Sequence, residues 1–388
     1  MITRRTILHS AAVLGVLGCI DTASAQQKRK TTAKKKGADD RAVVQSDARV
    51  EKVLAPVRDT HHLPGLIGAI LTGDKLAAIG AVGIRKIGSA LPIRVTDQVH
   101  LGSCTKAMTA TMIGMLVDEG KLTWRSTIRD VFPDAAPRLH DDFQKVTLTQ
   151  LLTHRAGLPA NGPWWHLAGQ STTEQRFSLL TAILSNPPQN RPGSTYAYSN
   201  VGYVLAGLMA EQVTGQSWEA LMQRRLFEPL GMSTAGFGSP GRPGSVDQPW
   251  GHRDSGGQVQ PTQQDNAPAM GPAGTVHCSI QDWGKFAALH LAGARGKAKL
   301  LKLSTFRVLQ TPPPGSEYAG GWIVLQRTWA GGRALNHNGT NTAWYSSIWL
   351  APARDFAILV STNQGGKVAE TASDEAVVEL IRAVDFLA

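Results

Sequence analysis

Apolar segments of strand length occur near both ends of this 388-residue chain, with a long stretch of different texture between them. Residues 63–71 are typical of a buried strand, and residues 76–83 are typical of its hairpin partner. The remaining strand patterns lie near the C-terminus, at residues 320–324, 343–350 and 356–361. Strands so far apart along the chain can share one sheet if the chain between them is an insertion. The pattern therefore predicts an α/β fold whose single sheet is interrupted by a helical lobe.

The stretch between these strands has the periodicity and the stop signals of helices. Residues 106–119 place Met108, Met112, Met115 and Leu116 at helical spacing before Gly120, a stripe that we interpret as core. Other helices are predicted at residues 42–60, 147–152, 201–214, 217–226 and 369–386. Residues 238–274 are rich in Gly, Pro, Gln and Ser, which predicts a long loop. We place the folded domain at 45–388, with its α/β part at about 45–102 and 275–388 and its helical lobe at about 103–274.

Residues 1–25 have the features of a twin-arginine-type signal peptide. The pair Arg4–Arg5 is followed by an apolar run at residues 11–20 and by a small-residue cleavage site at residues 23–25. That run is too short to cross a bilayer as a retained helix. A lipobox ending at Cys19 is the alternative, and it would leave a lipid-anchored protein. We expect a periplasmic or secreted protein.

Residues 26–38 carry +6 of the formal charge of +11, and we interpret the segment 26–44 as a basic linker. Six Lys and Arg residues stand between residues 28 and 36, among Gln, Thr, Ala and Gly that cannot bury a core. The rest of the chain carries little excess charge, so no nucleic-acid partner is predicted. The linker is expected to act as a solubilising tether; weak attraction to an anionic cell envelope is the alternative.

Two cysteines, Cys104 and Cys278, remain after the signal segment, and we expect two buried thiols in preference to a disulfide. The chain has no H-x-H, H-E-x-x-H or C-x-x-C pattern. We therefore predict no metal and no other cofactor.

Ser103 and Lys106 form the only S-x-x-K motif in the chain. A serine hydroxyl is a weak nucleophile and needs a base within hydrogen-bond reach. Residues three apart on a helix share one face, so Lys106 can approach the Ser103 hydroxyl. The alternative is a helix N-cap serine followed by an exposed lysine.

Tyr198 and Asn200 form the only Y-x-N motif. A phenol, whose ordinary pKa is near ~10, acts as a base only if a cation stabilises its phenolate, and Lys106 could supply that charge. Asn200 could hold Lys106 and donate to a substrate carbonyl. Tyr196 lies in the same segment and is interpreted as a packing aromatic.

With His337–Gly339, the two motifs complete an ordered set that resembles the serine β-lactamase and penicillin-binding family, in which S-x-x-K, Y-x-N and a K/H-x-G strand line one cleft. The likeness extends from about Val50 to the C-terminus. It implies an antiparallel sheet flanked by helices with an inserted all-helical lobe, and hydrolysis through an acyl-enzyme. The catalytic residues that it implies are Ser103, Lys106 and Tyr198. The substrate-binding residues are Asn200, His337, Asn338, Gly339 and Thr340, of which Thr340 would share an oxyanion hole with the Ser103 N–H.

His337 departs from most β-lactamases, which have Lys at this position and Thr or Ser at that of Asn338. The departure resembles the DD-peptidase, D-aminopeptidase and esterase branches. We expect His337 on an edge strand facing the cleft, where its protonated form would attract a substrate carboxylate. Gly339 would leave room for a substrate backbone. A purely structural histidine is the alternative.

These observations favour an exported serine hydrolase with esterase, D-amino-acid peptidase or β-lactamase activity. Its substrate would be a small molecule or a peptide, and the protein is expected to be a monomer. A penicillin-binding sensor or envelope scaffold without turnover is the alternative function. Trp164 and Trp165 are expected at the rim of the cleft, whereas Trp344 is equally well explained by core packing.

Overall fold

The computed structural model describes residues 45–297 and 299–387. The expected signal peptide at residues 1–25, with Cys19, and the expected linker at 26–44 lie outside the described residues. Within the described ranges, no helix combines the length and the apolar character needed to span a membrane.

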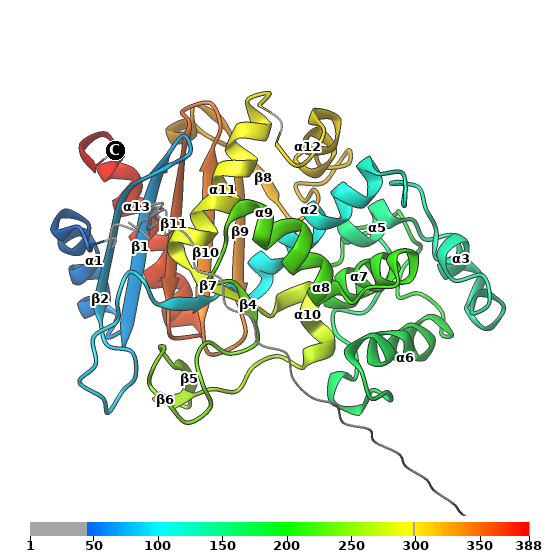
Figure 1. Cartoon of the computed structure of the whole chain (residues 1–388), viewed down its shortest axis with the longest axis horizontal. Helices are drawn as coiled ribbons and strands as arrows, with labels where there is room; N and C mark the ends of the chain where they lie inside the picture. The colour runs from blue at the N-terminus through cyan, green and yellow to red at the C-terminus, as the bar shows by residue number, and fades with distance from the viewer. Residues whose placement is uncertain (1–44, 298, 388) are drawn as a thin grey trace, which may run out of the picture. The chain divides into compact units, whose positions relative to one another are not determined.

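One six-stranded antiparallel sheet joins the two ends of the described chain, as predicted. Its strands are β1 (Gly65–Thr72), β2 (Lys75–Gly83), β8 (Ile323–Arg327), β9 (Gly332–Thr340), β10 (Tyr345–Ala351) and β11 (Phe356–Thr362). Their order is β2-β1-β11-β10-β9-β8, so the N-terminal hairpin pairs with the C-terminal strand β11. Figure 1 shows the blue N-terminal strands beside the red and orange C-terminal strands. Because β1 lies between β2 and β11, seven of its eight residues are buried, which explains its continuous apolar sequence.

Helices cover both faces of this sheet. On one face α1 (Ala48–Thr60) and α13 (Lys367–Leu387) pack against side chains such as Ile70 and Val360. On the other face α11 (Ile280–Ala294) packs against the alternate side chains, such as Leu71 and Leu359. Figure 1 shows α11 and α13 on opposite sides of the strands. Because successive side chains of a strand point to opposite faces of the sheet, each face has its own hydrophobic core.

The helical lobe is built around α2 (Thr105–Asp118), in which residues 105–116 are all buried. The methionine stripe of this helix belongs to the core, as predicted. The longer lobe helices are α6 (Thr172–Leu184) and α7 (Asn200–Thr214). The shorter ones are α3 (Ile128–Val131), α4 (Asp141–Gln144), α5 (Leu148–Leu152), α8 (Trp218–Met222), α9 (Glu228–Leu230) and α10 (Gly271–Gly274). Helix α12 (Leu303–Leu309) follows α11, outside the residues expected for the lobe. Because almost all of α2 is buried, the packing around this helix fixes the position of the S-x-x-K motif at its start.

Residues 238–274 are more ordered than the predicted long loop. They contain the hairpin of β5 (Gly251–Ser255) and β6 (Gln258–Thr262), whose turn places Gly256 and Gly257 at positive φ. A second small sheet joins β3 (Gln98–His100), β7 (Val276–Ser279) and β4 (Gly236–Phe237). The segment expected as an all-helical lobe therefore also carries short strands. They escaped prediction because they are short and mostly polar, so they carry no apolar alternation.

Cys104 and Cys278 are both buried and unpaired, which confirms the expected thiols.

Candidate active site

Ser103 lies in a 3₁₀ turn, Gly102–Cys104, that leads directly into α2. Gly102 has a φ of +49°, and a Cβ atom there would lie 2.3 Å from the backbone nitrogen of Thr340. A Cβ atom on Gly339 would lie 2.1 Å from the Leu101 carbonyl oxygen and 2.6 Å from the Ser103 nitrogen. The turn and the end of β9 are therefore in backbone contact, which glycine alone permits. Gly339 makes room for the nucleophile turn, and its predicted pairing with a substrate backbone stays a prediction.

Lys106 follows one helical turn after Ser103, and its side chain is fully buried. Its Nζ lies 3.1 Å from Ser103 Oγ, 2.7 Å from Asn200 Oδ1 and 2.7 Å from the Ala273 carbonyl oxygen. Burial lowers the pKa of Lys106 well below its ordinary value. The amine can therefore be neutral at a pH where an exposed lysine is charged.

Tyr198 is the second side chain in hydrogen-bond contact with the Ser103 hydroxyl. Its hydroxyl donates to Ser103 Oγ at 2.8 Å, while Lys106 Nζ lies 4.8 Å from the centre of the phenol ring. Burial raises the pKa of Tyr198 above its ordinary value. The structure therefore favours a protonated phenol over the phenolate that the sequence suggested.

Local capping explains why the Y-x-N segment has this position. Ser199 is the N-cap of α7: its Oγ accepts from the Gly202 N–H at 3.1 Å and donates to the Pro159 carbonyl at 2.6 Å. The Ser199 N–H donates to His154 Nδ1 at 3.1 Å, and the His154 ring packs 4.4 Å from that of Tyr198. The segment is thus held by the loop that follows α5.

Asn200 is the first residue of α7, and both ends of its amide are bonded. Its Oδ1 accepts from Lys106, and its Nδ2 donates to Asn161 Oδ1 at 2.8 Å. The predicted contact with Lys106 is present. Asn200 and its partner Asn161 both line the cleft.

His337 does not face the cleft as predicted. Its side chain is 3% exposed, with Nε2 2.9 Å from the Tyr318 hydroxyl and Nδ1 2.7 Å from the Asn338 carbonyl oxygen. The carbonyl must accept, so Nδ1 carries the proton and Nε2 accepts from Tyr318. Burial, assisted by the nearby Lys106, lowers the pKa of His337 to about 3. A neutral buried imidazole cannot attract a substrate carboxylate, so the geometry opposes the charge role predicted for His337.

The strand around His337 is an edge only at its end. β8 pairs with β9 from Gly332 to Asn336, and only the last residues of β9 lack that partner among the described pairings. Asn338 points away from the cleft, because its Oδ1 accepts from Ser347 Oγ at 2.7 Å. The predicted contact of Asn338 with a substrate is therefore wrong. Thr340 is exposed and lines the cleft together with Ser103, as predicted.

The cleft in front of Ser103 has a volume of about 390 Å³. Trp164 and Trp165 line it as predicted, and the Trp165 side chain is 71% exposed, whereas Trp344 is buried in the core. A cavity of about 430 Å³ beside α5 and α12 is more apolar, but it contains none of the three motifs. The chemistry therefore belongs to the smaller cleft.

The motif analysis missed Arg253, Asp265 and Asn341, which also line this cleft. Arg253 donates to Thr342 Oγ1 at 3.0 Å and to Gln264 Oε1 at 3.3 Å, both neutral groups. Its Nε is buried without a hydrogen-bond partner in the described part of the chain. Arg253 and Asp265 lie in the segment expected to be a loop, and the only signal that could have singled them out is their charge in a mostly uncharged stretch.

The beta-lactamase family model matches residues 50–383, which is most of the chain. Among curated proteins, penicillin-binding protein 4 of Amycolatopsis lactamdurans is 24% identical over 327 residues, covering 80% of this chain and 83% of that protein. An unguisins hydrolase, ungD', of Aspergillus campestris is 24% identical over 337 residues, covering 82% of this chain. The chain spans only 61% of the length of that hydrolase.

Solved structures share the fold at low sequence identity. The octameric penicillin-binding protein homologue from Pyrococcus abyssi superposes with a TM-score of 0.70 at 21% identity. The match covers 87% of this chain and 77% of that one. At this identity the likeness concerns the arrangement of sheet and helices.

Proposed function

Because the chain belongs to the beta-lactamase family, we propose that it is a serine hydrolase that cleaves ester or amide bonds through an acyl-enzyme. The observation that carries this proposal is the chain of contacts from Tyr198 Oη through Ser103 Oγ to Lys106 Nζ, at 2.8 and 3.1 Å. A hydroxyl held between an acid and a base at the edge of an open cleft has what nucleophilic catalysis needs.

The contacts of Lys106 support its role as the base. A neutral amine has two N–H bonds and one lone pair. Asn200 Oδ1 and the Ala273 carbonyl are pure acceptors at 2.7 Å, so they take the two protons. The lone pair is then left for the hydroxyl proton of Ser103, whose Oγ accepts from Tyr198.

The reaction balances with these three side chains. Ser103 Oγ forms a bond to the substrate carbonyl carbon as its proton moves to Lys106 Nζ. The N–H groups of Ser103 and Thr340 stabilise the oxyanion, and Tyr198 protonates the leaving group as its bond to carbon breaks. Tyr198 regains a proton from the Lys106 ammonium. Water then attacks the acyl-enzyme and gives one proton to Lys106. When the ester bond breaks, the Ser103 oxygen takes that proton from the Lys106 ammonium, which leaves both groups as they began.

The substrate class and the location are part of this proposal. An ester, a D-amino-acid peptide or a β-lactam would each place a carbonyl in the cleft. The twin-arginine-type signal supports export to the periplasm or beyond. The alternative, a penicillin-binding sensor or scaffold without turnover, would need the same nucleophile but no effective attack by water.

The test combines labelling with turnover. The purified protein is incubated with a fluorescent fluorophosphonate and assayed with a chromogenic cephalosporin, a nitrophenyl ester and a D-Ala-D-Ala peptide. We expect labelling and turnover of at least one substrate by wild type, and neither by Ser103→Ala at an unchanged Tm. Acylation without turnover would favour the sensor, and labelling that persists in Ser103→Ala would contradict the proposal.

A further inference from the structure

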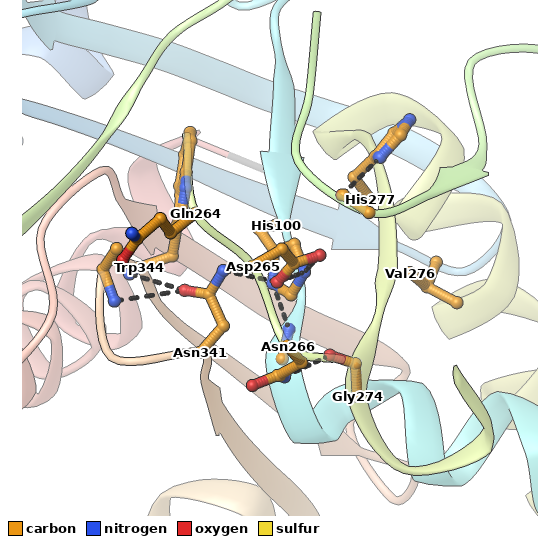
Figure 2. Close-up of polar contacts among 12 residues, drawn as sticks. His100, Gln264, Asp265, Asn266, Gly274, Val276, His277, Asn341 and Trp344 are labelled. Carbon is orange, nitrogen blue, oxygen red and sulfur yellow. Dashed lines mark hydrogen bonds and ion pairs between the residues drawn. The ribbon is translucent and has the colours of Figure 1, made fainter. Parts of the chain in front are cut away.

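Asp265 lies between the two segments that carry the backbone amides of the candidate oxyanion hole. Its side chain is 10% exposed and lines the cleft. Its Oδ2 lies 3.1 Å from His100 Nε2, and its Oδ1 accepts from Asn341 Nδ2 at 2.8 Å. Figure 2 shows the Asp265 carboxylate between the side chains of His100 and Asn341. One carboxylate therefore connects the end of β3 to the residue that follows β9.

The hydrogen bonds of His100 fix its protonation. The imidazole is fully buried, and its Nδ1 accepts from the Gly102 N–H at 3.1 Å. A nitrogen that accepts carries no proton, so the proton lies on Nε2 and is donated to Asp265. The connection runs from Asp265 through a neutral His100 to Gly102, the residue before the nucleophile.

The orientation of Asn341 is fixed in the same way. Its Oδ1 accepts from the Ala343 N–H at 3.1 Å and from the Trp344 N–H at 3.0 Å. The amide nitrogen must therefore face Asp265, as Figure 2 shows. Asn341 directly follows Thr340 and is 4% exposed. This second connection ends beside the other oxyanion-hole amide.

We propose that Asp265 is a positioning residue that sets the spacing between the Ser103 and Thr340 N–H groups by holding His100 and Asn341 together. The proposal rests on the acyl-enzyme function proposed above. The two amides come from distant parts of the chain and meet at the backbone contact of Gly102 and Gly339. Hydrogen-bond donors stabilise an oxyanion only when they lie at the position where its charge develops, and loss of one such donor costs about 10²–10³ in rate.

The ionised form of Asp265 suits this role. Burial opposes ionisation, but the hydrogen bonds that Asp265 accepts from His100 and Asn341 favour the ionised form, and the pKa of Asp265 lies below its ordinary value. A carboxylate accepts from both neighbours at once. An amide at this position would turn its NH₂ group towards one of the two donors, so it could satisfy only one of them.

This difference allows a test by exchange. Asp265→Asn should place two NH₂ groups face to face, and Asn341→Asp should place two carboxylates face to face. In the double variant Asp265→Asn/Asn341→Asp, the new amide oxygen can accept from His100 and its NH₂ can donate to the new carboxylate. That carboxylate can still accept from Ala343 and Trp344. The exchange therefore restores every hydrogen bond of the brace that His100, residue 265 and residue 341 form. Only the bond between residues 265 and 341 has its donor and acceptor reversed.

The measurements are the rate constant of fluorophosphonate labelling, kcat and KM for a neutral ester, and Tm. Each single variant should label about 10–100-fold more slowly, with kcat reduced and KM little changed, because the oxyanion forms only after binding. The exchange should recover the labelling rate to within about threefold. Asp74→Asn makes the same change in an exposed turn at the opposite end of the sheet, and it should have no effect.

A second pair of variants tests the connection if Asp265→Asn does not fold. His100→Ala should slow labelling, and His100→Gln, whose amide can accept from Gly102 and donate to Asp265, should restore most of the rate. Unchanged labelling by folded Asp265→Asn, or an exchange that restores Tm but not the labelling rate, would overturn the proposal. Failure of wild type to label at all would overturn the proposed function as well, so the two failures are distinct.

Discussion

Gly339 and Ser103 are in backbone contact: a Cβ atom on Gly339 would lie 2.6 Å from the Ser103 nitrogen. The His337–Gly339 motif therefore contributes to the site because Gly339 has no side chain. Its strand can then lie against the turn that carries the nucleophile. The exposed Thr340, one residue later, faces the same cleft.

Gly339→Ala should separate the strand from the nucleophile turn. The added methyl group would meet the Leu101 carbonyl at 2.1 Å, which is backbone and cannot rotate away. We expect labelling of Ser103 to slow by about 10²-fold or more, the cost of losing an oxyanion donor, together with a lower Tm. Gly274→Ala is the matched control, because its nearest neighbour is a side-chain nitrogen at 3.3 Å. Equal rates for the two variants would contradict the backbone-contact interpretation.

Tyr198→Phe removes the hydroxyl that donates to Ser103 Oγ. We expect kcat to fall by about 10²–10⁴-fold, the usual range for general acid–base catalysis. Tyr196→Phe should have far less effect, because Tyr196 is half-exposed and packs against His154. Steady-state kinetics on one nitrophenyl ester compares them. Similar losses in both would show that the hydroxyl of Tyr198 has no special role.

The pH dependence should report on Lys106. The amine accepts the Ser103 proton only when neutral, so kcat/KM should rise with pH through the Lys106 pKa, which burial places well below its ordinary value. The raised pKa of Tyr198 keeps the acid protonated, so no fall in rate is expected until strongly alkaline pH. Measuring kcat/KM for a neutral ester from pH 5 to 9 tests this.

Lys106→Arg is the control for that profile, because a guanidinium is not deprotonated in proteins. It should lose most of kcat at every pH. A rising limb that persists in Lys106→Arg with substantial activity would assign the base to another group.

Arg253 is the cation that a carboxylate-bearing substrate would meet in the cleft. Its partners are neutral, whereas His337 stays neutral down to a pKa of about 3. The ratio of kcat/KM for a carboxylate-bearing substrate to that for a neutral ester should therefore be constant between pH 5.5 and 8. Arg253→Gln should lower this ratio about 10-fold, the scale of one partly exposed charge-assisted contact. A ratio that falls as the pH rises through 6.5 in wild type would show that His337, and not Arg253, attracts the substrate carboxylate.

Much of the fold and the chemical identity of the site could be read from local sequence. Strand and helix patterns are set by the spacing of apolar residues, so the two ends of the sheet and the buried helix α2 were predicted. Ser103 and Lys106 are one helical turn apart, and Ser199 caps the helix that begins at Asn200. Short-range geometry of this kind needs no knowledge of the rest of the molecule.

The roles that depend on environment were decided by the tertiary structure. Burial raises the pKa of Tyr198 and lowers the pKa values of Lys106 and His337. The spacing of residues in the sequence contains no information on burial. The brace joins His100 of β3, Asp265 in the segment before α10 and Asn341, which follows β9. Such contacts arise only when distant segments pack. The sequence by itself thus determined which reacting groups are present, and the packing decided which of them carry charge and which face the substrate.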